Sequence, residues 1–362
     1  MTYDNGDYQA VMDQALHMAD WDGFAARAAV SRSRGLRRGI AIANYIEVAS
    51  GVPRERSEVT VRPNGSIDLV VGTMSSGQGH ETSFPQLVAE WLQVPMACVR
   101  FMANDTDFVP VGGGSVSGRS MRLVSITVGE AVEQILARGK AIAAHMLQQP
   151  REAAIAYADG EFAAAGGASV TLWDVASAAE TLDTLPADLR GPLSGVSEIV
   201  NRVGGYPYGA HVCEVEADPE TGHVQIVAWT GVDDVGRAVN PLILHGQAHG
   251  AIAQGLGQAL LERVVHDEGT GQLLTGSFMD YALPRADTVP FLNVALSEIA
   301  ASSHPHGIRP GGEGGTTPAL GAVMNAIVHA LSEFGVTHIE MPATPERVWR
   351  AIQAAKTGGV PT

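Results

Sequence analysis

The feature that most constrains the fold of this chain is a repeated order of strand, glycine-rich loop and helix. Residues 67–71 alternate like a strand and run into residues 72–79 (GTMSSGQG), and a helical apolar stripe from Phe84 to Leu92 follows. The same order returns in a strand-like segment at 98–103, the loop 111–120 (VGGGSVSGRS) and a long helix after it. This order predicts an α+β (mixed α/β) protein in which glycine-rich loops join strands to helices.

The two loops have the composition of anion-binding sites. Each offers backbone N–H groups and hydroxyls ahead of a helix N-terminus, where the helix dipole favours negative charge. Neither carries the Gly-Lys-Ser/Thr ending of a P-loop, and the third glycine of the dinucleotide fingerprint is absent, which argues against a Rossmann-type oxidoreductase. A tight turn of small residues is the alternative for either loop alone, but two together favour a phosphate-bearing ligand. The 42 glycines cluster in loops, which suggests a ligand that contacts much backbone.

A third glycine-rich loop, residues 306–318, presents a single carboxylate, Glu313, with two glycines on either side. The composition predicts Thr317 as N-cap and Pro318 as the first residue of a helix. Glycines allow the backbone to approach a ligand closely, so the carboxylate is a candidate for direct chemistry. An ordinary turn with a solvated glutamate is the competing interpretation of this stretch alone.

Length, charge and cysteine content narrow the class of protein. A chain of 362 residues predicts two domains or lobes. The net charge of −16 and the lack of any basic run argue against nucleic-acid binding. Cys98 and Cys213 cannot build a disulfide framework or a cysteine-ligated cluster by themselves. No apolar stretch is long enough to span a bilayer and no signal peptide opens the sequence, so a cytoplasmic protein without membrane insertion is expected.

The patterns divide the chain into four segments. Residues 1–38 are rich in helix formers and predict a helical N-terminal arm, 39–150 a first lobe, 151–205 a connecting segment, and 206–362 a second lobe. We expect mixed sheets with packed helices in both lobes and the glycine-rich loops at their interface. Further predicted elements are a strand at 40–47, a hairpin turn at 64–65, a strand at 169–171, a helix at 173–179, strands at 211–217 and 223–228, and a helix at 242–264.

Two histidines have the spacing of a zinc site, but the residue between them argues against one. His245 and His249 lie at i and i+4 of a predicted helix, which is the spacing of zincin ligands. Position 246 is Gly where a metalloprotease has its general-base glutamate, so that activity is rejected. His80 is expected to cap or hydrogen-bond the loop that it follows.

Several short motifs occur together over nearly the whole chain. They are GTMSSGQGH at 72–80, SGRS at 117–120, EVEADPETG at 214–222, DDVG at 233–236, NP at 240–241, GQAHG at 246–250, QGLG at 254–257, GEGG at 312–315 and ATPE at 343–346. In this order they resemble the molybdenum-binding large subunit of the xanthine dehydrogenase, aldehyde oxidase and carbon monoxide dehydrogenase family. Each motif alone is weak, whereas the ordered set is specific.

The resemblance implies a molybdenum–molybdopterin cofactor, expected in the cytosine dinucleotide form, with the metal held through the pterin dithiolene and by no protein ligand. Gln78 would hydrogen-bond near the metal and Gln247 at the pterin edge. The other residues that the resemblance assigns to cofactor binding are Gly77, Gly79, His80, Gly114, Ser115, Ser117, Gly118, Arg119, Ser120 and Gly312. Glu313 matches the general base that activates a metal-bound hydroxyl, as part of a molybdenum hydroxylase that oxidises an aldehyde or N-heteroaromatic C–H with water-derived oxygen.

The family's large subunits are much longer than this chain. Residues 3–8 (YDNGDY) resemble the opening of their second half, so the resemblance implies a C-terminal half made as a separate, split subunit. The other half of the molybdenum subunit, an iron–sulfur subunit with 2Fe-2S clusters and an FAD subunit are the expected partners, without which the chain would be inactive. A non-catalytic scaffold subunit of such a complex is the alternative, although a scaffold is expected to lose Glu313 or the loops.

Overall fold

The computed structural model describes residues 2–49, 51–151, 154–201 and 204–357. The chain forms two compact units, each assembled from separate stretches of sequence. Unit 1 comprises Met1–Val48, Tyr206–Ala301 and Arg309–Thr362, and unit 2 comprises Ala49–Gly205 and Ser302–Ile308. Mixed sheets and packed helices occur in both, which confirms the predicted α+β class. Within the described ranges, no helix is long and apolar enough to cross a membrane.

Unit 1 is built on a four-stranded sheet of order β1–β9–β10–β11. The strands are β1 Arg37–Ile46, β9 Tyr208–Ala217, β10 Val224–Asp234 and β11 Leu292–Ser297. β9 pairs antiparallel with both β1 and β10, while β11 joins β10 in parallel. The helices are α1 Tyr8–Met18, α2 Phe24–Ser33, α6 Pro241–Leu260, α7 Thr316–Ala330 and α8 Pro345–Thr357, with the 3-10 turns η1 Trp21–Gly23 and η4 Ser332–Phe334.

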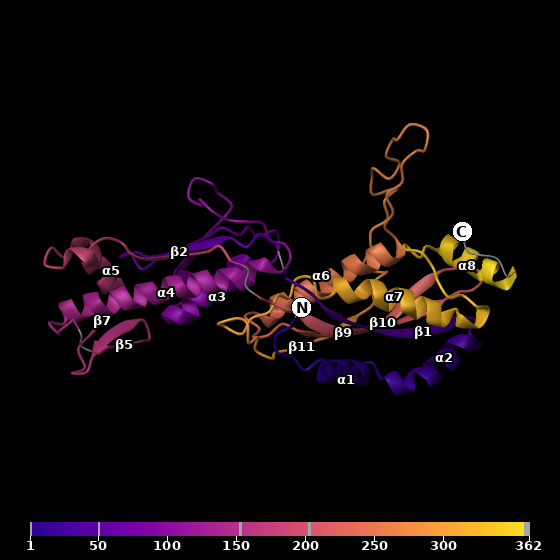
Figure 1. Ribbon diagram of the computed structural model, residues 1–362, viewed down its shortest axis with the longest axis horizontal. Helices are drawn as coiled ribbons and strands as arrows, with labels where there is room; N and C mark the ends of the chain where they lie inside the picture. The colour runs from indigo at the N-terminus through magenta and orange to yellow at the C-terminus, as the bar shows by residue number, and fades with distance from the viewer. Residues whose placement is uncertain (1, 50, 152–153, 202–203, 358–362) are drawn as a thin grey trace. The chain divides into compact units, whose positions relative to one another are not determined.

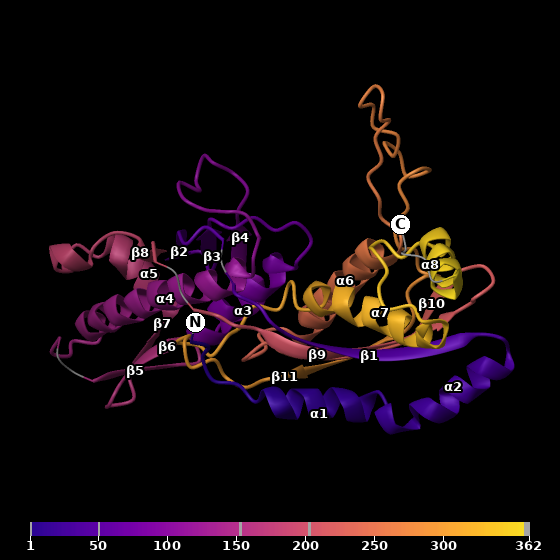
Figure 2. The same ribbon diagram turned by 45° about the vertical axis from the view of Figure 1, so that its right-hand side comes forward.

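Helices cover both faces of this sheet, as Figure 2 shows, with α1 and α2 on one side and α6 and α7 on the other. Side chains of a strand alternate between faces, so β9 serves two cores. Tyr208 and Val212 belong to the cluster under α1, and Cys213 and Ala217 to the cluster under α6, α7 and α8. Every residue of β9 is buried in consequence.

Unit 2 is built on a second four-stranded sheet, of order β4–β3–β2–β8. Its strands are β2 Glu55–Val61, β3 Ile67–Val71, β4 Val99–Met102 and β8 Leu193–Ile199, and a small sheet holds β5 Ile155–Ala158, β6 Glu161–Ala164 and β7 Ser169–Thr171. The helices are α3 His80–Leu92, α4 Arg119–Met146 and α5 Leu172–Thr181, with the 3-10 turns η2 Met96–Cys98 and η3 Ala187–Leu189. α3 and α4 pack together, and α4 lies against β2 and β8 (Figure 1).

The predicted elements are present with shifted ends. The hairpin turn at 64–65 joins β2 to β3, and both glycine-rich loops of unit 2 lead into helices. The helix predicted at 242–264 ends at Leu260. The prediction of Thr317 as N-cap was wrong: α7 begins at Thr316 after Gly315, because the Glu313 carbonyl already accepts the backbone N–H groups of residues 316 and 317 at 3.1 and 3.2 Å.

Close packing of β1 on α7 depends on a glycine and gives a stability prediction. A Cβ on Gly39 would lie 2.0 Å from the Ala326 carbonyl oxygen, whereas one on Gly321 would lie 3.8 Å from the Ala43 Cβ, at ordinary contact. Gly39→Ala should therefore lower the free energy of unfolding by about 1–3 kcal/mol through overpacking. Gly321→Ala, in an exposed part of the same helix, should raise it by about 0.5–1 kcal/mol. Urea denaturation measures both, and equal effects would contradict the packing.

Candidate functional site

The two glycine-rich loops of unit 2 lie against each other through their backbones. The first follows β3 directly and the second leads into α4. A Cβ on Gly72 would lie 2.2 Å from the Val111 carbonyl oxygen, and one on Gly112 would lie 2.0 Å from the Gly72 carbonyl oxygen. Only glycine permits this approach, so the sequence places the two loops side by side by omitting side chains there.

Hydroxyl groups from both loops converge beside a histidine. Thr73 Oγ1 lies 2.9 Å from Ser120 Oγ and 3.3 Å from Ser115 Oγ, and Ser120 Oγ lies 3.0 Å from Ser115 Oγ. His80 Nδ1 is 3.5 Å from Ser115 Oγ, and burial lowers the pKa of His80, which favours the neutral ring. The structure thus brings together three predicted residues, His80, Ser115 and Ser120. Thr73, which was not predicted as a site residue, joins them.

The helices that follow the loops begin in the same way. Gly79 (φ 72°) and Gly118 (φ 63°) are the left-handed N-caps of α3 and α4, and within the described part of the chain neither helix start has a side-chain cap. The first N–H groups of each helix are therefore suited to an anionic ligand. Gln78 folds back over the first loop, since its Oε1 accepts the Ser76 N–H at 2.5 Å, and Gly77 beside it has φ 104°.

Arg119 is buried beneath the second loop and is fully occupied by protein. Its guanidinium donates to the carbonyls of Val52 (3.0 Å), Gly114 (3.2 Å) and Arg54 (2.7 Å), and lies 2.8 Å from the Glu55 carboxylate. Both members of the ion pair are 0% exposed. Arg119 therefore fixes the loop from its buried side. Ser117, in the same loop, has a left-handed backbone conformation with φ 49°.

In unit 1, the loop that carries Glu313 is fastened to α6. A Cβ on Gly315 would lie 2.6 Å from the Ala248 carbonyl oxygen, and Thr316 Oγ1 donates to the Ala251 carbonyl at 2.7 Å. The Glu313 side chain is exposed, and its backbone carbonyl accepts hydrogen bonds from the first N–H groups of α7. The carboxylate is therefore presented from a rigid helix start.

Gln247 lies next to this loop. A Cβ on Gly312 would come within 3.6 Å of Gln247 Nε2, so the structure brings Gln247, Gly312 and Glu313 together on unit 1. The rings of His245 and His249 lie 6.5 Å apart. No group of three potential metal ligands occurs among the described residues.

A chain of buried hydrogen bonds lies behind Glu313. Tyr45 Oη donates to Asp233 Oδ1 at 2.7 Å, His211 Nε2 lies 2.8 Å from the same oxygen, and Trp229 Nε1 donates to His211 Nδ1 at 3.2 Å. Gly314 packs against these hydrogen-bonded side chains, since a Cβ on Gly314 would lie 2.4 Å from Tyr45 Oη. Of the four side chains that form these hydrogen bonds, only that of Asp233 belongs to one of the sequence motifs. The other three stand in segments without a recognisable motif.

A second carboxyl group, Glu47, follows β1 and hydrogen-bonds to Glu313. The pKa of Glu47 is raised to about 8, first by burial and then by the hydrogen bond and negative charge of Glu313. No local pattern predicts this partner, because residues 47 and 313 come together only through the pairing of β1 with β9 and the packing of α7.

Arg309 anchors the start of the same loop. It is 2% exposed, and its guanidinium lies 2.7 Å from Asp234 Oδ1 and donates to the carbonyls of Ile299 and Asn5. The Arg309 N–H donates to the Val235 carbonyl at 2.9 Å. The loop is thereby held at the end of β10 and at the N-terminal segment. Arg309 was not among the predicted site residues.

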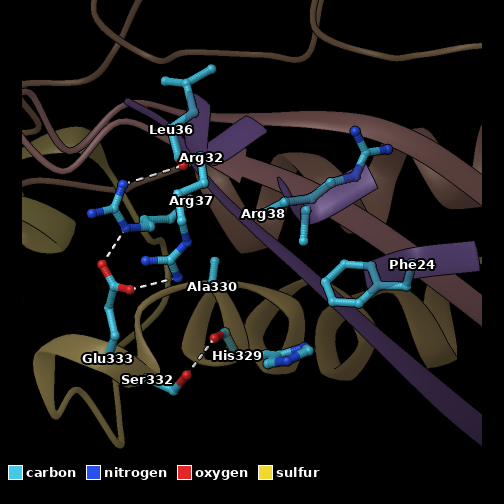
Figure 3. A pocket seen from close by; sticks show the side chains of 10 residues that line it. Phe24, Arg32, Leu36, Arg37, Arg38, His329, Ala330, Ser332 and Glu333 are labelled. Atoms are coloured by element: carbon cyan, nitrogen blue, oxygen red, sulfur yellow. Dashed lines mark hydrogen bonds and ion pairs between the residues drawn. The ribbon is translucent and has the colours of Figure 1, made fainter. Parts of the chain in front are cut away.

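A cavity of about 170 Å³ in unit 1 lies apart from these residues, among α2, β1 and the end of α7. Figure 3 shows Arg32 and Arg37 turned towards Glu333, which bonds to both, and Arg38 pairs with Glu214 on β9. The arginines that line the cavity are thus neutralised by carboxylates. We interpret these ion pairs as structural and not as a binding site.

The buried brace under the second loop gives a further prediction. Arg119→Met would leave Glu55 buried without its cation, so the free energy of unfolding should fall by about 3–5 kcal/mol. The matched control is Arg54→Met: its side chain is 53% exposed in a pair with Glu198, and the change should cost less than about 1 kcal/mol. Chemical denaturation of the two variants measures the difference, and similar costs would show that Arg119 is not a brace.

Comparisons with known proteins place these loops in a family. Residues 14–290 match the sequence profile of the Molybdopterin cofactor-binding domain. The chain is 29% identical to the carbon monoxide dehydrogenase large chain of Hydrogenophaga pseudoflava and 31% identical to the nicotine 6-hydroxylase large subunit of Paenarthrobacter nicotinovorans, in each case over 97% of this chain and 45% of the relative. It therefore spans less than half the length of these relatives.

The fold is similar to that of solved enzymes of the same group. Quinoline 2-oxidoreductase from Pseudomonas putida 86 aligns with a TM-score of 0.88 and 31% identity, over 96% of this chain and 46% of that chain. The reconstituted CO dehydrogenase from Oligotropha carboxidovorans aligns with a TM-score of 0.87 and 27% identity, over 98% and 46%. The chain therefore belongs to the family of molybdopterin cofactor-binding domains found in the large subunits of carbon monoxide dehydrogenase and xanthine dehydrogenase-type enzymes, as its ordered motifs predicted.

Proposed function

We propose that this chain is the cofactor-binding part of a molybdenum hydroxylase and supplies Glu313 as its general base. The observation that carries the proposal is the presentation of one exposed carboxylate from a helix start that α6 and Arg309 hold in place. A general base needs such fixed geometry within hydrogen-bond reach of the proton that it removes. The names of two relatives, a nicotine hydroxylase and a quinoline oxidoreductase, support an N-heteroaromatic substrate, and an aldehyde is the alternative.

The residues present fit a molybdopterin cofactor. The N-termini of α3 and α4, without side-chain caps among the described residues, and the hydroxyls of Ser115, Ser117 and Ser120 suit its phosphate groups. Gly77, where a Cβ would meet nothing within 4 Å, leaves room for a bulky group close to the backbone. The cytosine dinucleotide form is the expected one.

Each unit would contribute separate contacts to the cofactor. We propose Gln78, Gly79 and His80 as the cofactor contacts of unit 2, and Gln247 and Gly312 as those of unit 1. When bound, the molybdenum centre supplies the two-electron redox chemistry of C–H hydroxylation. The part of Glu313 is to accept a proton on a carboxylate oxygen, while Gln247 positions the pterin edge beside it.

An arm of unit 1 supports the expectation that other chains complete the enzyme. Residues 261–291 project from the end of α6 (Figures 1 and 2). Within them, an antiparallel β-bridge pairs His266 with Leu273. Phe278 is 78% exposed, Met279 93% and Phe291 88%. Large apolar side chains gathered on one projection are typical of an interface. We propose that the arm binds the other half of the molybdenum subunit, with a 2Fe-2S subunit and an FAD subunit completing a cytoplasmic complex.

The general-base role predicts the effect of Glu313→Gln in the native complex. The amide keeps the shape of the side chain but cannot accept a proton, so kcat should fall by about 10²–10⁴-fold. Molybdenum content, pterin fluorescence and subunit composition should stay at wild-type values. Near-normal turnover would overturn the role and favour a scaffold function, and loss of activity only through loss of molybdenum would make Glu313 a cofactor-retention residue.

The proposed interface predicts the effect of Phe278→Ser combined with Met279→Ser. Each buried side chain of this size contributes about 1.5–3 kcal/mol, so the double variant should weaken binding of the copurifying half-subunit at least about 10²-fold. Val30→Ser, which changes a 61% exposed valine on α2, is the control and should bind normally. Calorimetry or pull-down with the tagged full chain measures this, and unchanged binding by the double variant would refute the arm as the interface.

A further inference from the structure

We propose that Glu47 is a positioning residue for Glu313: its protonated carboxyl group donates a hydrogen bond that holds the Glu313 carboxylate ionised and oriented. The inference extends the proposed function, because it gives the general base a partner that controls its protonation. One proton is shared by the pair, residing on Glu47 and directed at a Glu313 oxygen.

The end of β1 places Glu47 against the loop. The Glu47 N–H donates to the Pro207 carbonyl at 2.9 Å, which continues the β1–β9 pairing by one residue. Side chains two apart on an extended chain share a face, so Glu47 lies on the same side as Tyr45. Tyr45 Oη is the atom that a Cβ on Gly314 would approach to 2.4 Å, and the same face therefore contacts the loop at 313 and 314.

One oxygen of the Glu47 carboxyl group is buried. Glu47 Oε2 is buried and has no hydrogen-bond partner among the described residues. A buried carboxylate oxygen without a partner is costly when the group is ionised and much less so when it is protonated. The hydrogen bond of the group is made to Glu313. This arrangement favours a neutral carboxyl group at Glu47.

The surrounding ionisable groups are engaged elsewhere. Ionisable groups of this sheet and loop include Tyr45 on β1, Tyr208 and His211 on β9, Asp233 and Asp234 on β10, and Arg309 before the loop. Asp233 accepts hydrogen bonds from Tyr45 and His211, and Arg309 is paired with Asp234. Glu313 is left as the group whose hydrogen bond and charge act on Glu47.

Two carboxyl groups in hydrogen-bond contact cannot both ionise at neutral pH, so one of them keeps a proton. The pKa of Glu47 is raised from 4.5 to about 8 by burial first, and then by the hydrogen bond and charge of Glu313. Near neutral pH Glu47 therefore donates and Glu313 accepts. Above pH 8 Glu47 loses its proton, and two adjacent negative charges repel.

Infrared difference spectroscopy of the full chain without cofactor tests the shared proton directly. The wild type should show the carbonyl band of a protonated carboxyl group that titrates away with a midpoint near pH 8. Glu47→Gln should remove this band, and Glu313→Gln should move its midpoint to lower pH by removing the negative charge. Glu58→Gln, on β2 of unit 2, should leave it unchanged. A band that survives Glu47→Gln, or no titration near pH 8, would overturn the inference.

The pH dependence of stability gives a second readout that needs no cofactor. The pKa of Glu47 is higher in the folded chain (about 8) than its ordinary value of 4.5, so the folded state binds more protons between these limits. The stability of the wild type should therefore fall relative to that of Glu47→Gln as the pH rises from 5 to 8, and the gap should stay constant above 8. Thermal unfolding of the two proteins in parallel measures this, and parallel profiles would count against a raised pKa.

Turnover of the molybdenum-loaded complex separates positioning from simple structural support. Glu47→Ala should lower kcat about 10–100-fold, as expected for loss of a hydrogen bond to a charged group, with KM and molybdenum content unchanged. Glu47→Gln keeps an N–H donor, so it should restore most of that loss and also abolish the decline in activity above pH 8. If Glu313→Gln retains activity, the general-base proposal fails, while the infrared and stability measurements still decide whether Glu47 holds the proton. An unchanged alkaline limb in Glu47→Gln would overturn the positioning role.

Discussion

The geometry of the candidate base depends on the buried ion pair between Arg309 and Asp234. Asp234 ends β10, and Arg309 stands four residues before Glu313, so the pair holds the start of the Glu313 loop at the end of β10. Both side chains are 0% exposed, and loss of either partner would leave an uncompensated buried charge. The same arginine also binds the backbone of Asn5. Two stretches distant in sequence thereby support one short loop.

Several glycines in these loops allow protein segments to approach each other closely. Gly72 packs against Gly112, Gly314 against Tyr45, and Gly315 against the backbone of α6. The loops are therefore rigid before any ligand binds, and rigidity is what a cofactor site or a general base requires.

The accuracy of the sequence predictions follows the range of the interactions concerned. Helices α3 and α4 and the hairpin of β2 and β3 were predicted, because apolar periodicity and turn residues are local signals. The roles of Arg309 and Glu47 were not, because their partners lie far away along the chain and become neighbours only when β9 pairs with both β1 and β10. Arg119 sits within a recognised motif, yet the motif could not reveal that its guanidinium points into the protein and pairs with Glu55. The contacts of the other site residues with a cofactor stay a proposal.

The choice of partner for a catalytic carboxylate has a chemical consequence. A carboxylate that an arginine orients is a weaker base, because the positive charge lowers its pKa. A protonated carboxyl group can orient a carboxylate through a hydrogen bond without that effect, and this is the part that we propose for Glu47. Arg309, which stands before the loop, is directed at Asp234 and at backbone carbonyls. In this arrangement the cation fixes the position of the loop, and the neutral acid fixes the direction of the carboxylate.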